Sequence, residues 1–344
     1  CSNRFYKMIR IKIPILKFSI AIMLLFSSTY GVCQKVTMPE DNSISYLIPD
    51  SIRSQLELVL EGQQKIESIL PLIDRLSRQN PSICSSIIQK LLLEGKVVKY
   101  NESWAKLQYY NTWIDIEQYS ENEELALLRE QTEECCQLFE EKHNTYWLAK
   151  CYSLLSIIYY NISYNNDEKL FLNASRFNQL ALSLASQEDY STLGEIFRIR
   201  GNICLTKSDC LIDTTLAHYD RALKFYNLNN DLSGQADVLL NKAIASKTMI
   251  SQQDTSLFLK LPEEYFQQAL SITQHPNDFR KVRLDYAIYL QDKFNTTKEG
   301  KWYRKSNEQV FKIIQEPISH KSEAYLQLAI NNQNFLAYAG NSIP

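Results

Sequence analysis

The sequence predicts an all-α protein built as an α-solenoid, a stack of antiparallel helix pairs that share one continuous core. Two observations carry this prediction. The 344 residues include only 8 glycines and 9 prolines, and such scarcity of helix breakers favours helix over most of the chain. Apolar residues also recur at helical spacing in segments that match one another every 42 to 45 residues, and self-similarity at such a period is typical of repeat proteins.

The first segment, residues 1–34, has the pattern of a targeting sequence. Basic residues precede the apolar run 18–26, and small residues follow it. This order is typical of a secretory signal peptide, which we place near residues 8–33. The run is shorter than the ~20 residues of a membrane span, which favours a cleaved signal peptide. An uncleaved signal anchor is the alternative, and membrane contact is expected only through this segment. We therefore expect an exported protein of the bacterial periplasm or cell envelope, with a linker at 35–50.

The second segment, residues 51–120, is predicted to be helical but shows a poor repeat signal. Pro71 is expected to kink or break a helix, and Asn80-Pro81 to begin the next one. The end of a solenoid needs units that differ from the rest, because they shield its open end. We interpret these residues as divergent N-terminal repeats or a cap.

The repeat register sharpens in residues 121–344. First-helix positions recur at spacings of 45, 42, 43 and 43, namely Tyr152, Phe197, Leu239, Val282 and Tyr325. Four positions after each lies a site that is small in four of five units: Ser156, Gly201, Ala243, Tyr286 and Ala329. Two helices are expected to cross there, since only a small side chain allows an interaxial distance of ~8–10 Å.

The second helices show a matching pattern. An aromatic residue is followed within four positions by alanine, and the packing residues expected are Ala181, Ala222 and Ala269, together with Tyr219. The best-formed unit is Thr215–Ala245, in which the polar turn Asn229–Asp231 separates two helices. Ser233 is the expected N-cap of the helix that follows.

The Tyr-x-x-Ala-Leu segment, the polar turn and the small site together resemble the tetratricopeptide repeat over roughly residues 120–335. This resemblance implies a right-handed superhelix that binds an extended peptide or a partner helix on a concave surface lined by first helices. The period exceeds the family's ~34 residues, and Tyr286 is large at a small site. A plain irregular helical array is the alternative.

If first helices line a groove, their polar residues are the candidates for partner binding. These are Arg198, Arg200, Asn202, Asn241, Lys242, Arg283 and Asp285. The partner expected is a protein or peptide.

The sequence offers little for other chemistry. A formal net charge of −2 argues against a general nucleic-acid binder, which is usually basic. No glycine-rich phosphate loop is present, and His143, His218, His275 and His320 are not at metal-ligand spacing. We therefore expect no cofactor, no metal and no catalytic residues. Cys151 with His143 is the one nucleophile–base pair to consider, and nothing in the sequence orients it.

The eight cysteines form no C-x-x-C pair, and several lie within apolar helical faces. They are interpreted mainly as small buried hydrophobic residues. In an exported chain, a disulfide between Cys204 and Cys210, or one that involves Cys135 or Cys136, remains open.

These observations predict a non-catalytic interaction scaffold. The alternative is the sensing or regulatory arm of a larger protein with a downstream catalytic domain, such as a caspase-like peptidase or a sensor histidine kinase. Residues 331–344 show no capping helix with a polar outer face, so we expect a chain truncated at its C-terminus. The reading frame beyond Pro344 would distinguish the two hypotheses.

Overall fold

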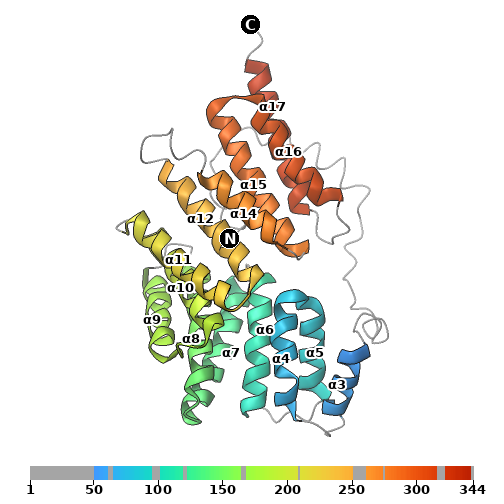
Figure 1. Ribbon diagram of the computed structural model, residues 1–344, viewed down its shortest axis with the longest axis vertical. Helices are drawn as coiled ribbons and strands as arrows, with labels where there is room; N and C mark the ends of the chain where they lie inside the picture. Colours follow the sequence, from blue (N-terminus) through green and yellow to red (C-terminus); the bar gives the residue numbers. More distant parts are fainter. Residues whose placement is uncertain are drawn as a thin grey trace. The chain divides into compact units, whose positions relative to one another are not determined.

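A computed structural model describes residues 50–60, 65–94, 101–118, 122–163, 168–207, 210–250, 261–273, 276–315 and 322–341 (Figure 1). Every regular element in these ranges is helical, and they contain no strand, which confirms the all-α prediction. The predicted signal segment, and all of the predicted linker except its last residue, lie outside the described residues. The chain divides into two compact units, 1–97 and 98–344.

Unit 1 contains three α-helices and one 3₁₀ turn within its described part: α3 (Asp50–Leu60), η2 (Ile66–Ser68), α4 (Leu70–Gln79) and α5 (Pro81–Glu94). Both prolines lie in a first turn, Pro71 in α4 and Pro81 in α5, where the missing amide proton costs nothing. The break predicted at Pro71 is therefore a helix start. The Asn80 side chain accepts a hydrogen bond from the Ile83 amide at 3.2 Å and caps α5.

Unit 2 begins with α6 (Glu102–Gln118) and α7 (Asn122–Glu141), and four helix pairs follow. A first helix and its second helix make up each pair: α8 (Thr145–Ile162) with α9 (Glu168–Leu184), α10 (Tyr190–Thr206) with α11 (Ile212–Leu228), α12 (Leu232–Ile250) with α14 (Leu261–Ile272), and α15 (Pro276–Thr297) with α16 (Gly300–Gln315). The last described helix is α17 (Ser322–Asn341).

The first helices form one continuous layer in unit 2. Each of α8, α10, α12 and α15 packs against its own second helix and against the next first helix, and α15 also contacts α17. The second helix of one pair contacts the first helix of the next. Every pair thus shares its core with its neighbours, which is the arrangement of an α-solenoid. By its contacts, α6 belongs to this unit.

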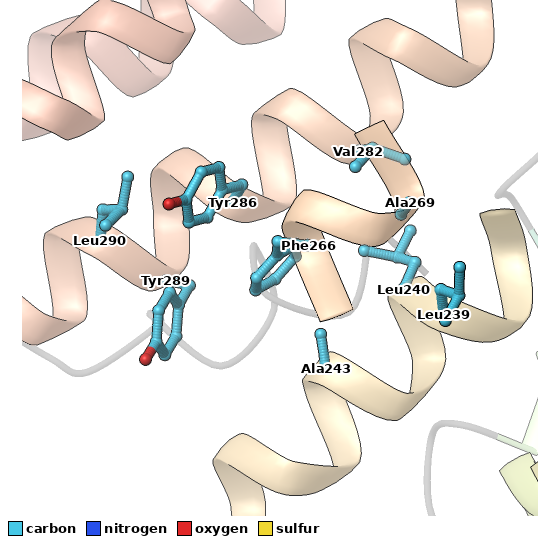
Figure 2. Packing of buried hydrophobic residues seen from close by; sticks show 9 residues of the cluster. All are labelled: Leu239, Leu240, Ala243, Phe266, Ala269, Val282, Tyr286, Tyr289 and Leu290. Carbon is cyan, nitrogen blue, oxygen red and sulfur yellow. The ribbon is translucent and has the colours of Figure 1, made fainter. Parts of the chain in front are cut away.

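Figure 2 shows the shared core between two pairs. Its buried residues come from three helices: Leu239, Leu240 and Ala243 of α12, Phe266 and Ala269 of α14, and Val282, Tyr286, Tyr289 and Leu290 of α15. The large Tyr286 fits at a site that is small elsewhere because its ring stacks on Phe266, with ring centroids 5.0 Å apart. Burial of each such aromatic side chain contributes about 1.5–3 kcal/mol, so neither pair is complete alone.

Most of the predicted packing residues are buried in the core of unit 2. Ser156, Ala181, Gly201, Tyr219, Ala222, Ala243 and Ala269 are all buried. Ala329 is exposed, so its predicted packing role is wrong for the described residues. Ala329 is exposed because, within the described residues, α17 has no second helix of its own to cover it.

The turn between α11 and α12 also corrects one detail. Asn230 has a φ of 53°, a left-handed conformation that asparagine tolerates. The capping side chain of α12 is Asp231, whose Oδ1 accepts a hydrogen bond from the Gly234 amide at 2.9 Å. Ser233, the expected N-cap, already lies within α12 and instead donates to Oδ2 of Asp278 on α15 at 2.9 Å.

Candidate interaction surface

The seven predicted groove residues do not form an open groove. Asn202, Asn241, Lys242 and Asp285 are buried, each with 4–7% of its surface exposed, and the expectation that they face solvent is wrong. Each first helix is packed on several sides, by its own second helix and by neighbouring helices. Polar residues on it must therefore find partners inside the protein, since an unpaired buried polar group is costly.

Several of these residues attach a first helix to a second helix, either of the same pair or of the preceding pair. Asn202 Oδ1 accepts a hydrogen bond from the Tyr219 hydroxyl at 2.8 Å. Lys242 Nζ lies 2.6 Å from Asp220 Oδ1 and 4.6 Å from the centre of the Tyr265 ring.

Two arginines of the predicted set make comparable contacts, because Arg200 Nε donates to Asn178 Oδ1 at 3.0 Å and Arg283 Nη1 to Gln309 Oε1 at 2.9 Å. These residues therefore hold the helix pairs together.

A different set of charges links successive first helices. Glu195 and Arg198 form an ion pair on α10, and the Tyr226 hydroxyl donates to Glu195 Oε2 at 2.6 Å. Asp237 of α12 pairs with Lys281 of α15, with Nζ 2.8 Å from Oδ1. Arg198 is close enough to Asp237 to stabilise its charge. We name Glu195, Arg198, Asp237 and Lys281 the first-helix charge row.

The charge row is half-buried, and its charges stabilise one another. Its side chains keep 11–27% of their surface exposed. Burial alone would raise the pKa of the Asp237 carboxyl, but Lys281 and Arg198 outweigh it and hold that pKa below its usual range. Burial opposes the charge of Arg198 in the same way, and Glu195 outweighs it, so the pKa of the guanidinium is raised.

The row continues as a polar seam between α12 and α15. Ser233 contacts Asp278 at one end, and Lys247 pairs with Asp292 at the other. The partners are 44 or 45 positions apart in sequence along the whole seam, one or two more than the 43-residue spacing of these two first helices. The seam therefore follows directly from the stacking register.

Of the seven predicted residues, only Arg198 belongs to the charge row, and sequence reasoning missed the other three. A signal was present. A charged residue lies six positions before the small site in every unit: Lys150, Glu195, Asp237, Arg280 and Glu323. Lys150 likewise faces Asp189 at 3.9 Å, and both side chains are buried.

The described residues contain no group of three His, Cys, Asp or Glu side chains placed to hold a metal ion. Burial raises the pKa of the Cys84 thiol to about 12 and raises that of Cys151 well above its usual value. A buried thiol with a raised pKa is a poor nucleophile, which removes the basis for pairing Cys151 with His143.

His218 is enclosed by cations. Its ring stacks on Phe197, with centroids 6.2 Å apart, and burial, Arg200 and Arg221 lower its pKa. His275 and His320 lie outside the described residues.

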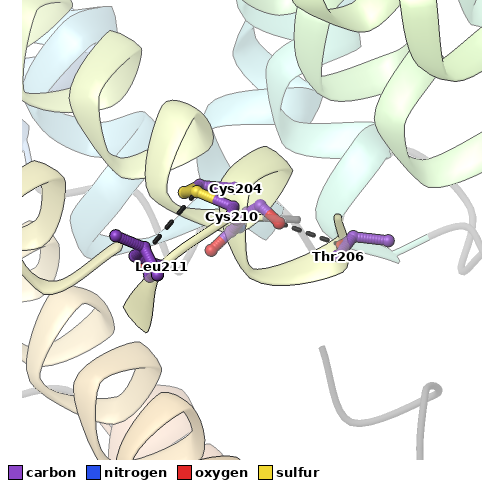
Figure 3. Close-up of a disulfide and its surroundings, with 5 residues drawn as sticks. Cys204, Thr206, Cys210 and Leu211 are labelled. Atoms are coloured by element: carbon purple, nitrogen blue, oxygen red, sulfur yellow. Dashed lines mark hydrogen bonds between the residues drawn. A yellow bond between two sulfur atoms is a disulfide. The ribbon is translucent and has the colours of Figure 1, made fainter. Parts of the chain in front are cut away.

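The described part of α10 ends at a disulfide between Cys204 and Cys210 (Figure 3). Their Cα atoms lie 5.5 Å apart, which suits such a bond. In the helix end beside it, the Thr206 hydroxyl donates to the Asn202 carbonyl at 3.0 Å. Of the two pairings left open by the sequence, this is the one that forms, because Cys135 and Cys136 are free and buried.

No protein-family model matches this chain, and no curated protein matches it. Within the described residues, every helix is too short or too polar to span a membrane.

Proposed function

We propose that this chain is a protein–protein interaction scaffold of the tetratricopeptide type, acting by binding and not by catalysis in the bacterial cell envelope. The observation that carries the proposal is the first-helix charge row. The ion pair on α10 and the ion pair that joins α12 to α15 lie close enough for Arg198 to stabilise the charge of Asp237, and all four side chains remain partly open to solvent. Three consecutive repeat units thus present a single surface to a ligand.

The chemistry of the row indicates what such a ligand would carry. Signs alternate along it, from Arg198 to Asp237 to Lys281. Alternating charges discriminate between partners because a misplaced like charge is repelled. An extended peptide or a helix with complementary alternating charges would match the row. The rigid helices that hold these charges lose little entropy on binding.

Export is part of the proposal, and one feature supports it. The Cys204–Cys210 bond is of a kind that persists in the oxidising periplasm and is rare in the cytosol. Fractionation of the native host, with detection of the full chain, tests this part separately. Recovery from the cytosol in reduced form would contradict it.

The binding role can be tested by photo-crosslinking in the native host. A photoreactive phenylalanine analogue replaces Phe279, which is half-buried on α15 two positions before Lys281. The control carries the analogue at Leu172, which is 57% exposed on the second helix α9. We expect a specific crosslinked protein only from position 279. Equal crosslinking from both positions, or none from position 279, contradicts the proposal.

A further inference from the structure

Two arginines and a histidine gather around one buried aromatic ring of the α10–α11 pair. The ring belongs to Phe197 of α10, which is 7% exposed. The guanidinium carbon of Arg200 lies 5.8 Å from the ring centre, and that of Arg221, on α11, lies 5.5 Å from it. The His218 ring stacks on the same side chain. Arg221 disfavours the charge of Arg200, and both arginines disfavour protonation of His218, so the three groups form one cationic cluster.

The protein holds this cluster in a fixed geometry. Arg200 Nε donates to Oδ1 of Asn178 on α9 at 3.0 Å. Asn178 is itself fully buried and donates from Nδ2 to the Ile196 carbonyl at 2.9 Å. Phe225 stacks on Phe197 with centroids 5.7 Å apart. Side chains positioned in this way lose little entropy when a ligand binds.

The cluster has no acidic partner among the described residues. No ion pair in this part of the chain involves Arg200 or Arg221, and Asp220, next to Arg221 in sequence, pairs with Lys242 instead. The terminal Nη groups of Arg200 and the whole Arg221 guanidinium make no hydrogen bond to any described residue. Nδ1 of His218 is also buried without a described partner. The cluster therefore retains unused hydrogen-bond donors.

Arg198, two positions away, shows what Arg200 lacks. Both arginines are half-buried on α10, and Glu195 raises the pKa of Arg198. Burial and the charge of Arg221 instead lower the pKa of Arg200, and no described carboxylate offsets them. Because arginine stays charged in proteins, this unfavourable energy persists in the folded chain. A bound anion would relieve it.

We propose that Arg200, Arg221 and His218 form a binding site for a tetrahedral oxyanion of the phosphate type, either the free anion or the head of a phosphate ester. The two guanidinium groups carry two positive charges, which a phosphate ester of about −1.5 to −2 charge would balance. A phosphate also offers oxygens to two guanidinium groups at once, whereas a single guanidinium already satisfies a carboxylate as a bidentate pair.

This site is separate from the first-helix charge row. Arg198 belongs to the row and Arg200 to the site, and residues two positions apart project from opposite sides of a helix. The inference therefore does not depend on the proposed function.

Isothermal titration calorimetry of the full chain tests the ligand class. The ligands are inorganic phosphate, glycerol phosphate and acetate, at one ionic strength because salt screens exposed charges. We expect saturable phosphate binding with a Kd of ~1 mM or lower, and at least ~10-fold weaker binding of acetate, a singly charged carboxylate. Tighter binding of glycerol phosphate than of inorganic phosphate assigns an ester as the ligand, and the reverse order assigns the free anion.

Two variants locate the site. Arg221→Gln removes one cation of the cluster. Arg176→Gln is the matched control, because Arg176 is also exposed on a second helix and lies 6.0 Å from the ring centre of Phe177. Both variants should unfold at the wild-type temperature, since both side chains are exposed. We expect Arg221→Gln to weaken phosphate binding at least ~10-fold, because hydrogen bonds to charged groups are strong, and Arg176→Gln to leave it unchanged.

The protonation of His218 gives a readout that needs no variant. A bound dianion stabilises the imidazolium, so the pKa of His218 in an NMR titration should be higher in saturating sulfate than in chloride of equal ionic strength. Sulfate suits this titration because it remains a dianion throughout the pH range. A purely structural role of the two arginines would leave that pKa unmoved.

Four results would each overturn the proposal. They are the absence of saturable phosphate binding up to ~10 mM, acetate binding as tight as that of phosphate, equal effects of Arg221→Gln and Arg176→Gln, and a His218 pKa that sulfate does not raise.

Discussion

Substitution of Gly201 gives the sharpest test of the helix register. An added Cβ at this position would clash with Cε1 of the Tyr219 ring and lie 2.6 Å from its Cδ1, far inside van der Waals contact. The ring cannot move aside cheaply, because Tyr219 is fully buried and its hydroxyl is bonded to Asn202. α10 and α11 would have to separate at their crossing.

The magnitude follows from two opposing effects. Overpacking of a tight core costs about 1–3 kcal/mol, and Ala in place of Gly within a helix returns up to ~1 kcal/mol. We expect Gly201→Ala to lower the free energy of unfolding by about 1–2 kcal/mol, and the larger Gly201→Leu by more. For a unit of this size, each kcal/mol lowers the melting temperature by ~2–4 °C.

Calorimetry or circular dichroism would measure this change against a matched control. Gly300 opens α16, and a Cβ added there meets nothing within 4 Å. Gly300→Ala should therefore leave the melting temperature unchanged or raise it slightly. A smaller side chain in Tyr219→Leu should partly rescue Gly201→Ala in a double-mutant cycle. If Gly201→Ala and Gly300→Ala behave alike, the assignment of Gly201 to a helix crossing is refuted.

Three further predictions concern charge and oxidation. Because the pKa of Asp237 is lowered in the folded state, its carboxylate stabilises the fold fully at pH values above ~3.9, the pKa of an unfolded Asp. That stability is lost as the pH falls through the lower pKa of the folded state. Lys281→Met should raise that pKa and move acid unfolding to higher pH; an unchanged acid midpoint contradicts this. The pKa of His218 should fall below ~6.5 in an NMR titration, so stability should decline as pH drops below that unfolded value; a value at or above it argues against the cationic enclosure. Reduction of Cys204–Cys210, six positions apart, should cost about 2 kcal/mol by chain entropy, and the double serine variant should show no response to reductant; a wild-type chain equally indifferent to reductant would show that the bond does not form.

The sequence was sufficient to predict the helices and the crossings between them. Apolar spacing located the pairs, and the small sites Ser156, Gly201 and Ala243 lie at buried contacts. Such sites can be predicted from the sequence because a helix crossing limits the size of one side chain, and the same limit recurs in each repeat unit.

The surface was much harder to predict. Asn202 and Lys242 are polar, and sequence alone placed them in an open groove. Their burial depends on helices that are far away in sequence, and helical periodicity describes only one helix at a time. The pairing of Asp237 with Lys281 needed the three-dimensional register between α12 and α15, although the recurring charge six positions before the small site was visible.

One measurement tests most directly whether the first-helix charge row binds a partner. The double variant Asp237→Asn/Lys281→Gln keeps a polar side chain at both positions but removes both charges. Crosslinking from position 279 is quantified in this background, and thermal unfolding is recorded alongside. We predict that the yield of the crosslinked partner falls at least ~10-fold while the melting temperature stays within a few degrees. An unchanged yield in the folded variant would contradict the account.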